Sequence, residues 1–196
     1  MKLKDRIRGY LPVVIDVETS GFNEQTDALL EICAIILGMD EEGSFFAKTT
    51  LHYHVEPFKG ANIEASAIKF NGIDIDNPFR LAVPEKKALS EIFDHINEEL
   101  ETEECSRAIL VGHNAFFDLG FVKAATLRAN LKSPFHQFST IDLTRPKAQC
   151  CFDHHWGVWT LPAPSVSSCC DLLHWGGCRQ GKPASPGAVF AVGCCA

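Results

Sequence analysis

A short apolar run that ends in two acids stands at residues 12–19, with the sequence PVVIDVET. The leading proline and the β-branched residues predict a buried first strand over residues 12–17. Side chains at positions i and i+2 of a strand project from the same face, so Asp16 and Glu18 point one way while Val17 enters the core. The carboxyl end of this strand is therefore the first place to expect a site.

The rest of the first 143 residues alternates between strand-like and helix-like patterns of apolar residues. Two further strands at short intervals predict an antiparallel meander with the first. The expected strands are 29–37, 50–56, 107–111 and 138–143, and the expected helices are 64–70, 84–100 and 115–129. This order, β-β-β-α-α-β-α-β, predicts an α/β domain with a mixed five-stranded sheet flanked by helices.

Residues at the expected helix ends support these boundaries. Gly72 follows Asn71 at the end of the first helix, which is a good C-terminal cap signal. Pro84 suits the first turn of the second helix, and Asn114 is a plausible N-cap for the third.

Composition and charge restrict the classes of protein. With 46% apolar and 22% charged residues and a length of 196, the chain has an ordinary composition for one globular domain. No apolar run reaches membrane-spanning length, and the charged start lacks a signal sequence, so we expect a cytoplasmic protein without a membrane partner. The net charge of −7 argues against binding nucleic acid through a general positive field.

The character of the chain changes after residue 143, where seven of the nine cysteines and all three tryptophans lie. We predict a domain over residues 1–143 and a separate tail over residues 144–196. A shifted reading frame explains this tail best, because its cysteine doublets fit neither a disulfide framework nor zinc-ligand spacing. A zinc site at Cys151, His154 and His155 and an ordinary flexible extension are the alternatives.

Two adjacent carboxylates are hard oxygen ligands, which Mg²⁺ prefers, and two such ions about 3.5–4 Å apart can clamp a phosphodiester for hydrolysis. A lone Asp-x-Glu pair is more often a solvated strand end, so the surrounding sequence decides. The segments DVETSGF (16–22) and DALLEICA (27–34) resemble the first motif of the DEDD exonucleases, and VGHNAFFD (111–118) resembles the second. By this resemblance Asp16, Glu18 and Asp118 are catalytic and bind metal.

Further segments resemble the ribonuclease T family within that superfamily. They are RGYLPVVIDVET (8–19), LHYHVEPF (51–58), FNGID (70–74) and PFHQF (134–138), and the resemblance extends from about residue 6 to 142. It implies a ribonuclease H-like fold, whose C-terminal part is incomplete here, and a homodimer. It also implies a 3′→5′ exoribonuclease that trims the 3′ ends of tRNA and other structured RNAs, with single-stranded DNA as a further substrate. Two Mg²⁺ ions would be the cofactors, with Mn²⁺ as the alternative.

The resemblance also implies that four phenylalanines stack on the terminal bases: Phe22, Phe70, Phe117 and Phe138. Stacking contributes about 1–3 kcal/mol per base, which suits an acidic protein. Core packing is the competing explanation for each of the four. A basic patch that reaches the partner subunit's site is implied at Arg6, Arg8, Arg107 and Lys132, each otherwise an ordinary surface cation. Glu101 places an acid at one position of this patch and would weaken it.

The third motif of the family, a histidine followed five residues later by an aspartate, is missing. Five residues after His154, His155 and His174 stand Trp159, Thr160 and Arg179. Since the histidine is the general base and the aspartate a metal ligand, we expect severely reduced hydrolysis. A nucleic-acid-binding module that does not cut is therefore an alternative function. A DNA-proofreading exonuclease of the same superfamily is another, which the matches at 70–74 and 134–138 disfavour.

Overall fold

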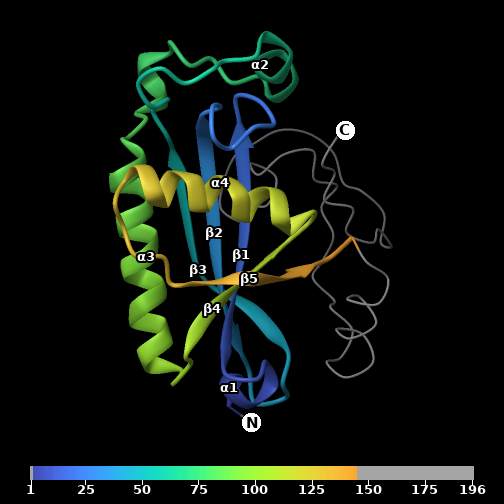
Figure 1. Ribbon diagram of the computed structural model, residues 1–196. Helices are drawn as coiled ribbons and strands as arrows, with labels where there is room; N and C mark the ends of the chain where they lie inside the picture. The colour runs from blue at the N-terminus through green and yellow to red at the C-terminus, as the bar shows by residue number, and fades with distance from the viewer. Residues whose placement is uncertain (1, 145–196) are drawn as a thin grey trace.

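The computed structural model describes residues 2–144, coloured in Figure 1. The three alternatives for the tail concern residues 144–196, which lie outside the described residues except for Thr144.

Five strands and four α-helices make up the described part of the chain, with one short 3₁₀ helix between the second and third α-helices. In chain order they are α1 (Leu3–Arg6), β1 (Tyr10–Thr19), β2 (Leu29–Met39), β3 (Phe45–His54), α2 (Ala65–Asn71), η1 (Pro78–Arg80), α3 (Glu85–Thr102), β4 (Arg107–Gly112), α4 (Ala115–Arg128) and β5 (Phe135–Asp142). Every predicted strand and helix is present, whereas α1 and η1 were not predicted.

The strands form one mixed sheet in the order β3-β2-β1-β4-β5. The first three strands are an antiparallel meander, while β4 pairs in parallel with β1 and β5 in parallel with β4. The predicted α/β fold with a mixed five-stranded sheet is therefore confirmed. Because β1, β4 and β5 run the same way, their carboxyl ends meet at one edge of the sheet (Figure 1).

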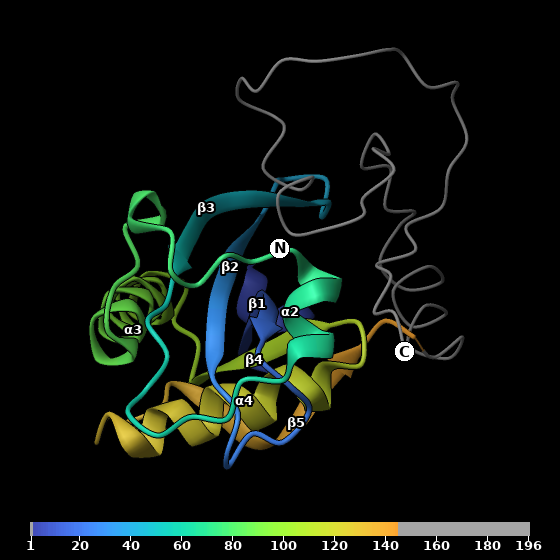
Figure 2. The same ribbon diagram turned by 90° about the horizontal axis from the view of Figure 1, so that it is seen from above.

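One face of the sheet carries the main core, and α3 and α4 cover it (Figure 2). Alternate residues of β1, such as Ile15 and Val17, point into this core, and Ile92 of α3 and Phe121 of α4 meet them there. We call this the helix-covered face. The other described helices, α1 and α2, have four and seven residues. The opposite face, which carries Asp16 and Glu18, is called the open face.

The capping residues at two helix ends can be compared with those predicted from the sequence. Gly72 adopts the left-handed conformation at φ 70° and ends α2, as predicted. Asn114 occupies the N-cap position of α4, as predicted, but its side chain makes no capping hydrogen bond and its φ is 55°. Instead, the backbone N–H of Asn114 donates to Asp142 Oδ1 at 3.2 Å. The last residue of β5 therefore holds the backbone at the start of α4.

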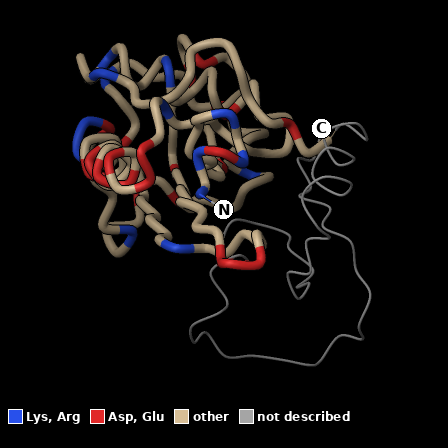
Figure 3. The backbone as a smooth tube through the Cα atoms, turned by 90° about the horizontal axis from the view of Figure 1, so that it is seen from below, with Lys and Arg blue, Asp and Glu red and all other residues tan. Residues whose placement is uncertain are grey.

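Acidic residues gather on α3 (Figure 3). The helix carries six acids and two lysines. This helix packs on the helix-covered face, so much of the negative charge lies away from the carboxylates of the open face. No helix among residues 2–144 is both long and apolar enough to cross a bilayer.

The loop that follows β1 is held by a buried aspartate. Asp27, 1% exposed, accepts hydrogen bonds from the Asn23 N–H, the Thr26 hydroxyl and the Asn62 amide at 2.8–2.9 Å. These bonds hold the pKa of Asp27 below its ordinary value, although burial alone would raise it. The same three hydrogen bonds fix the position of the Asp27 carboxylate, so it cannot shift to make room for a larger side chain beside it.

We therefore expect the substitution Gly21→Ala to destabilise this loop. A methyl group at Gly21 would overlap Asp27 Oδ2 and come within 2.8 Å of Asp27 Cγ. The expected loss is about 2 kcal/mol in the free energy of unfolding, measured by denaturant titration. Gly120→Ala is the matched control, because a methyl group in that helix meets Glu24 only at 3.7 Å and should be neutral or mildly stabilising. Equal stability of the two variants would contradict the expectation.

Candidate active site

Asp16, Glu18 and Asp118 come together at the carboxyl end of β1. Asp16 and Glu18 alternate with buried residues, so both carboxylates project from the open face. Strand β4 ends at Gly112, which leaves the backbone N–H of Val17 without a strand partner on that side. Asp118, in the first turn of α4, accepts a hydrogen bond from this N–H at 3.1 Å. The parallel β1–β4 pair and the turn into α4 therefore bring the third acid to the first two.

The electrostatics of these acids show how closely they crowd one another. Burial raises the pKa of Asp118 to about 8, and the charges of Asp16 and Glu18 add to this effect. Burial also raises the pKa of Glu18 to about 7, with further contributions from Asp16 and Glu31. A cation between these groups would relieve their repulsion, so the donor set fits a divalent metal with oxygen ligands.

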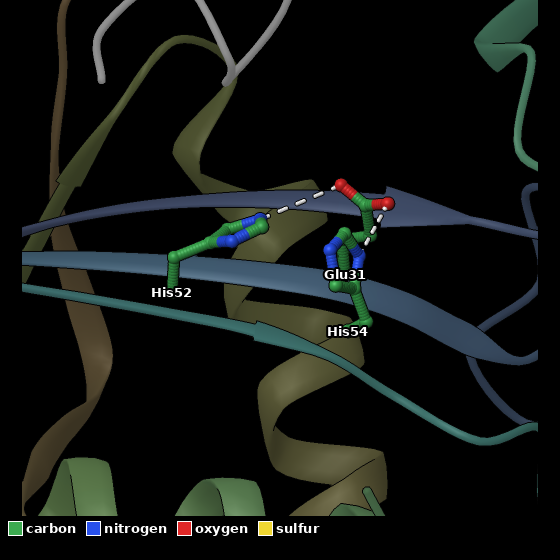
Figure 4. Close-up of side chains that lie close together, drawn as sticks. All are labelled: Glu31, His52 and His54. Atoms are coloured by element: carbon green, nitrogen blue, oxygen red, sulfur yellow. Dashed lines mark hydrogen bonds and ion pairs between the residues drawn. The ribbon is translucent and has the colours of Figure 1, made fainter. Parts of the chain in front are cut away.

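A second group on the open face was not singled out from the sequence. The carboxylate of Glu31 on β2 faces His52 and His54 on β3 (Figure 4), and the ligand atoms of the three lie within 4.8 Å of one another. His54 Nδ1 lies 2.9 Å from Glu31 Oε1, and His52 Nε2 lies 3.5 Å from Oε2. Among the described residues this group can hold a metal. Its sequence signals were an acid in an apolar strand and two histidines spaced by one residue.

The sheet register joins this group to the acids. Glu18 pairs across the ladder with Glu31, which in turn pairs with His54. Burial alone would raise the pKa of Glu31, but the two histidines outweigh it and hold this pKa below its ordinary value. The Glu31 carboxylate in turn raises the pKa of His52. One continuous row of ionisable groups therefore crosses the open face from β1 to β3.

Two of the four predicted stacking residues touch each other near the acids. Phe22, in the loop after β1, is 72% exposed, and its ring meets that of Phe117 at 6.3 Å between centroids. Phe117 also contacts Phe121 and packs partly against the core. Phe70 is exposed on α2, which is tied to the end of β1 by the bond from Asn71 Nδ2 to the Thr19 carbonyl, 3.1 Å.

Phe138 owes its exposure to an irregularity in β5. Ala108 pairs with Phe135 and Leu110 with Thr140, so β5 advances five residues while β4 advances two. The extra residues bulge outward, and Nδ1 of His136 accepts hydrogen bonds from the backbone N–H groups of Phe138 and Ser139. Phe138 is 78% exposed as a result, with the ammonium of Lys123 lying 5.6 Å from its ring centroid.

The four predicted cations lie at the opposite end of the sheet. Arg107 begins β4 and pairs with Tyr10 at the start of β1, two residues after Arg8. Lys132 precedes β5, and Arg6 belongs to α1. Gly9 and eight strand residues, 10–17, separate Arg8 from Glu18, and the strand part alone spans roughly 27 Å along β1. Within one chain, these cations therefore lie far from the three acids.

Comparison with known proteins shows the class to which the chain belongs. A family model described as exonuclease matches residues 13–149. Solved structures of exonuclease I share the fold. One of them has a TM-score of 0.54 at 18% identity, and the match covers 73% of this chain and 30% of that one. The E. coli enzyme in complex with a dT13 oligonucleotide gives a TM-score of 0.55, also at 18% identity, over 72% and 29%.

Relatives with higher sequence identity identify the family within this class. Ribonuclease T of Vibrio parahaemolyticus is 58% identical over 144 residues, which cover 72% of this chain and 67% of that protein. Ribonuclease T of Vibrio campbellii matches with the same identity and coverage. The chain belongs to the ribonuclease T family of 3′→5′ exoribonucleases. The match spans about two thirds of the length of these relatives.

Proposed function

We propose that this chain acts on the 3′ ends of tRNA and other structured RNAs as a metal-dependent 3′→5′ exoribonuclease in the cytoplasm, with low activity. The convergence of Asp16, Glu18 and Asp118 carries this proposal, because three acids from two elements form most of an oxygen donor set for metal-dependent phosphodiester hydrolysis. These residues would hold Mg²⁺, or Mn²⁺ in its place. Bound ions would supply a nucleophile from water and would stabilise the charge of the leaving oxygen.

The surrounding residues would place the RNA end at the acids. Phe22 and Phe117 form a joint aromatic surface next to Asp118, on which terminal bases can stack. Phe70 and Phe138, exposed on α2 and on the β5 bulge, would add two further stacking positions. An exonuclease that binds RNA by base stacking depends less on contacts between cations and phosphates. This mode of binding is compatible with the net charge of −7.

A homodimer would give the cations a role. Since Arg6, Arg8, Arg107 and Lys132 lie at the far end of the sheet from the acids of their own chain, they would contact RNA held in the active site of a partner subunit. The acidic Glu101 would weaken this contact. The dimer is part of the proposal and is tested by light scattering of the purified chain.

The experiment is a trimming assay on the purified full chain with a 5′-labelled RNA hairpin that has a short 3′ overhang, in Mg²⁺. We expect slow, stepwise shortening from the 3′ end, at least about 100-fold slower than by Vibrio parahaemolyticus ribonuclease T, because the general base is missing. Trimming at the rate of that relative would contradict the effect of the missing motif. Internal cleavage, or trimming that persists in EDTA, would contradict the proposal itself.

The missing motif favours one second candidate, a module that binds RNA 3′ ends without cutting them. Fluorescence anisotropy separates the two: tight binding of the overhang RNA with no products after prolonged incubation would indicate the binding module. A single-stranded DNA of the same sequence tests the DNA-directed alternative in the same experiment.

A further inference from the structure

Glu31, His52 and His54 form a compact group of mixed ligands on the open face, separate from the three acids. Glu31 is 9% exposed, and both histidines lie half-buried on the adjacent strand. All three side chains point toward one another from neighbouring strands (Figure 4). The sheet register fixes this arrangement, because Glu31 pairs directly with His54 and His52 projects from the same face two residues earlier.

The two histidines differ in their spacing from Glu31, because His54 Nδ1 lies at hydrogen-bonding distance, 2.9 Å from Glu31 Oε1, whereas His52 lies further away. His52 Nε2 is buried and lies 3.5 Å from Glu31 Oε2, an ion-pair distance that is too long for a strong hydrogen bond. Two ligands of one tetrahedral zinc ion, with bonds of about 2.0–2.1 Å, lie roughly 3.4 Å apart. The gap between His52 and Glu31 therefore has the length that a shared ion would need.

The chemistry of the donors selects the kind of ion. Imidazole nitrogen suits Zn²⁺ and related transition metals, whereas Mg²⁺ prefers oxygen ligands only. Two imidazoles with one carboxylate provide three ligands, and a water molecule would complete a tetrahedron. The neighbouring carboxylate of Glu18 adds negative charge that favours a cation on this face.

We propose that Glu31, His52 and His54 bind one zinc-type transition-metal ion, which links β2 to β3 beside the three acids. Such an ion would cancel the negative charge of Glu31 next to Glu18 and would hold the two strands in register. Its ligands do not include Asp16 or Asp118, so it is independent of the proposed nuclease function.

Titration of the metal-stripped full chain with Zn²⁺ tests the proposal, with isothermal calorimetry as the readout. We expect a Zn²⁺-binding event, distinct from any binding at the three acids, whose affinity falls at least tenfold in His52→Gln and in His54→Asn, since amides are poor zinc ligands. His95→Gln is the matched control, because His95 is exposed on α3 next to Glu98 and should leave the affinity unchanged. Asp118→Asn should also retain this event, which separates failure of the proposal from failure of the nuclease function.

Cobalt substitution distinguishes this group from the cysteine-rich segment after residue 143. Co²⁺ at two histidines and a carboxylate gives ligand-field bands without the thiolate charge-transfer band, and these bands should disappear in His52→Gln. Unchanged zinc affinity in both histidine variants, or a cobalt spectrum with thiolate bands alone, would overturn the proposal.

If the variants do not fold, the unmodified chain still gives a test. Zn²⁺ should slow the reaction of His52 and His54 with diethyl pyrocarbonate, mapped by mass spectrometry, while exposed His95 reacts at its usual rate. Equal reactivity of His52 and His54 with and without saturating Zn²⁺ would overturn the proposal.

Discussion

Asp118→Asn is expected to remove the stabilisation of the protein by Mg²⁺ and, at the same time, to make the metal-free protein more stable. The carboxylate of Asp118 is 4% exposed, and burial together with the charges of Asp16 and Glu18 raises its pKa to about 8. Ionised Asp118 is therefore unfavourable without a cation. Asparagine keeps an acceptor for the Val17 N–H but carries no charge.

The measurement is thermal unfolding in EDTA and in millimolar Mg²⁺. In EDTA we expect the variant to gain at least about 1 kcal/mol, or roughly 3 °C in Tm. In Mg²⁺ the rise in Tm seen for the unmodified chain should be lost, and any trimming of RNA should fall below detection. Asp94→Asn, on the exposed side of α3, is the control and should change neither quantity. A lower Tm in EDTA, with the Mg²⁺ effect intact, would show that Asp118 is a structural acid.

Arg128→Met should have the largest effect on stability. The Arg128 guanidinium donates to both oxygens of the buried Glu85 carboxylate at 2.7 and 3.1 Å and to the Glu24 carbonyl at 3.1 Å. It also lies 4.2 Å from the ring centroid of Phe58. One side chain therefore joins the start of α3, the end of α4 and two loops. Its removal leaves a carboxylate that is only 7% exposed without a counter-charge.

We expect a loss of about 3 kcal/mol, or roughly 6–12 °C in Tm, measured by thermal unfolding. The double variant Arg128→Met/Glu85→Gln should recover part of this loss, because it no longer buries an uncompensated charge. As a control, Lys2→Met removes an exposed ion pair with Glu104 and should cost less than about 1 kcal/mol. A double variant less stable than Arg128→Met would contradict this explanation.

The position of Asp118 shows which part of the candidate site local sequence patterns can predict and which part they cannot. The alternation in β1 was enough to predict that Asp16 and Glu18 share one face, because the strand period of two depends only on the backbone. The approach of Asp118 was expected from motif resemblance, and the pairing that produces it, β1 parallel to β4, joins residues about a hundred positions apart. No periodicity in either segment specifies that pairing.

The exposure of Phe138 and the backbone contact at the start of α4 could not be predicted from local sequence patterns. The bulge in β5 depends on how β5 registers against β4, and its first residues were predicted too late, at 138 instead of 135. Likewise Asn114 carries a capping side chain by type, yet Asp142 receives its N–H. Both outcomes follow from contacts between separate elements, which compete with local preferences and override them.

The sequence by itself determined the order of strands and helices, the face that each β1 residue takes, and the acids at the end of β1. These properties arise from backbone periodicity and short-range turn chemistry, which neighbouring residues encode directly. Only the tertiary structure decided that Glu31, His52 and His54 meet, that Arg128 joins four segments, and that the cations lie at the far end of the sheet from the acids. Those outcomes depend on strand order and register, which packing of the whole domain selects.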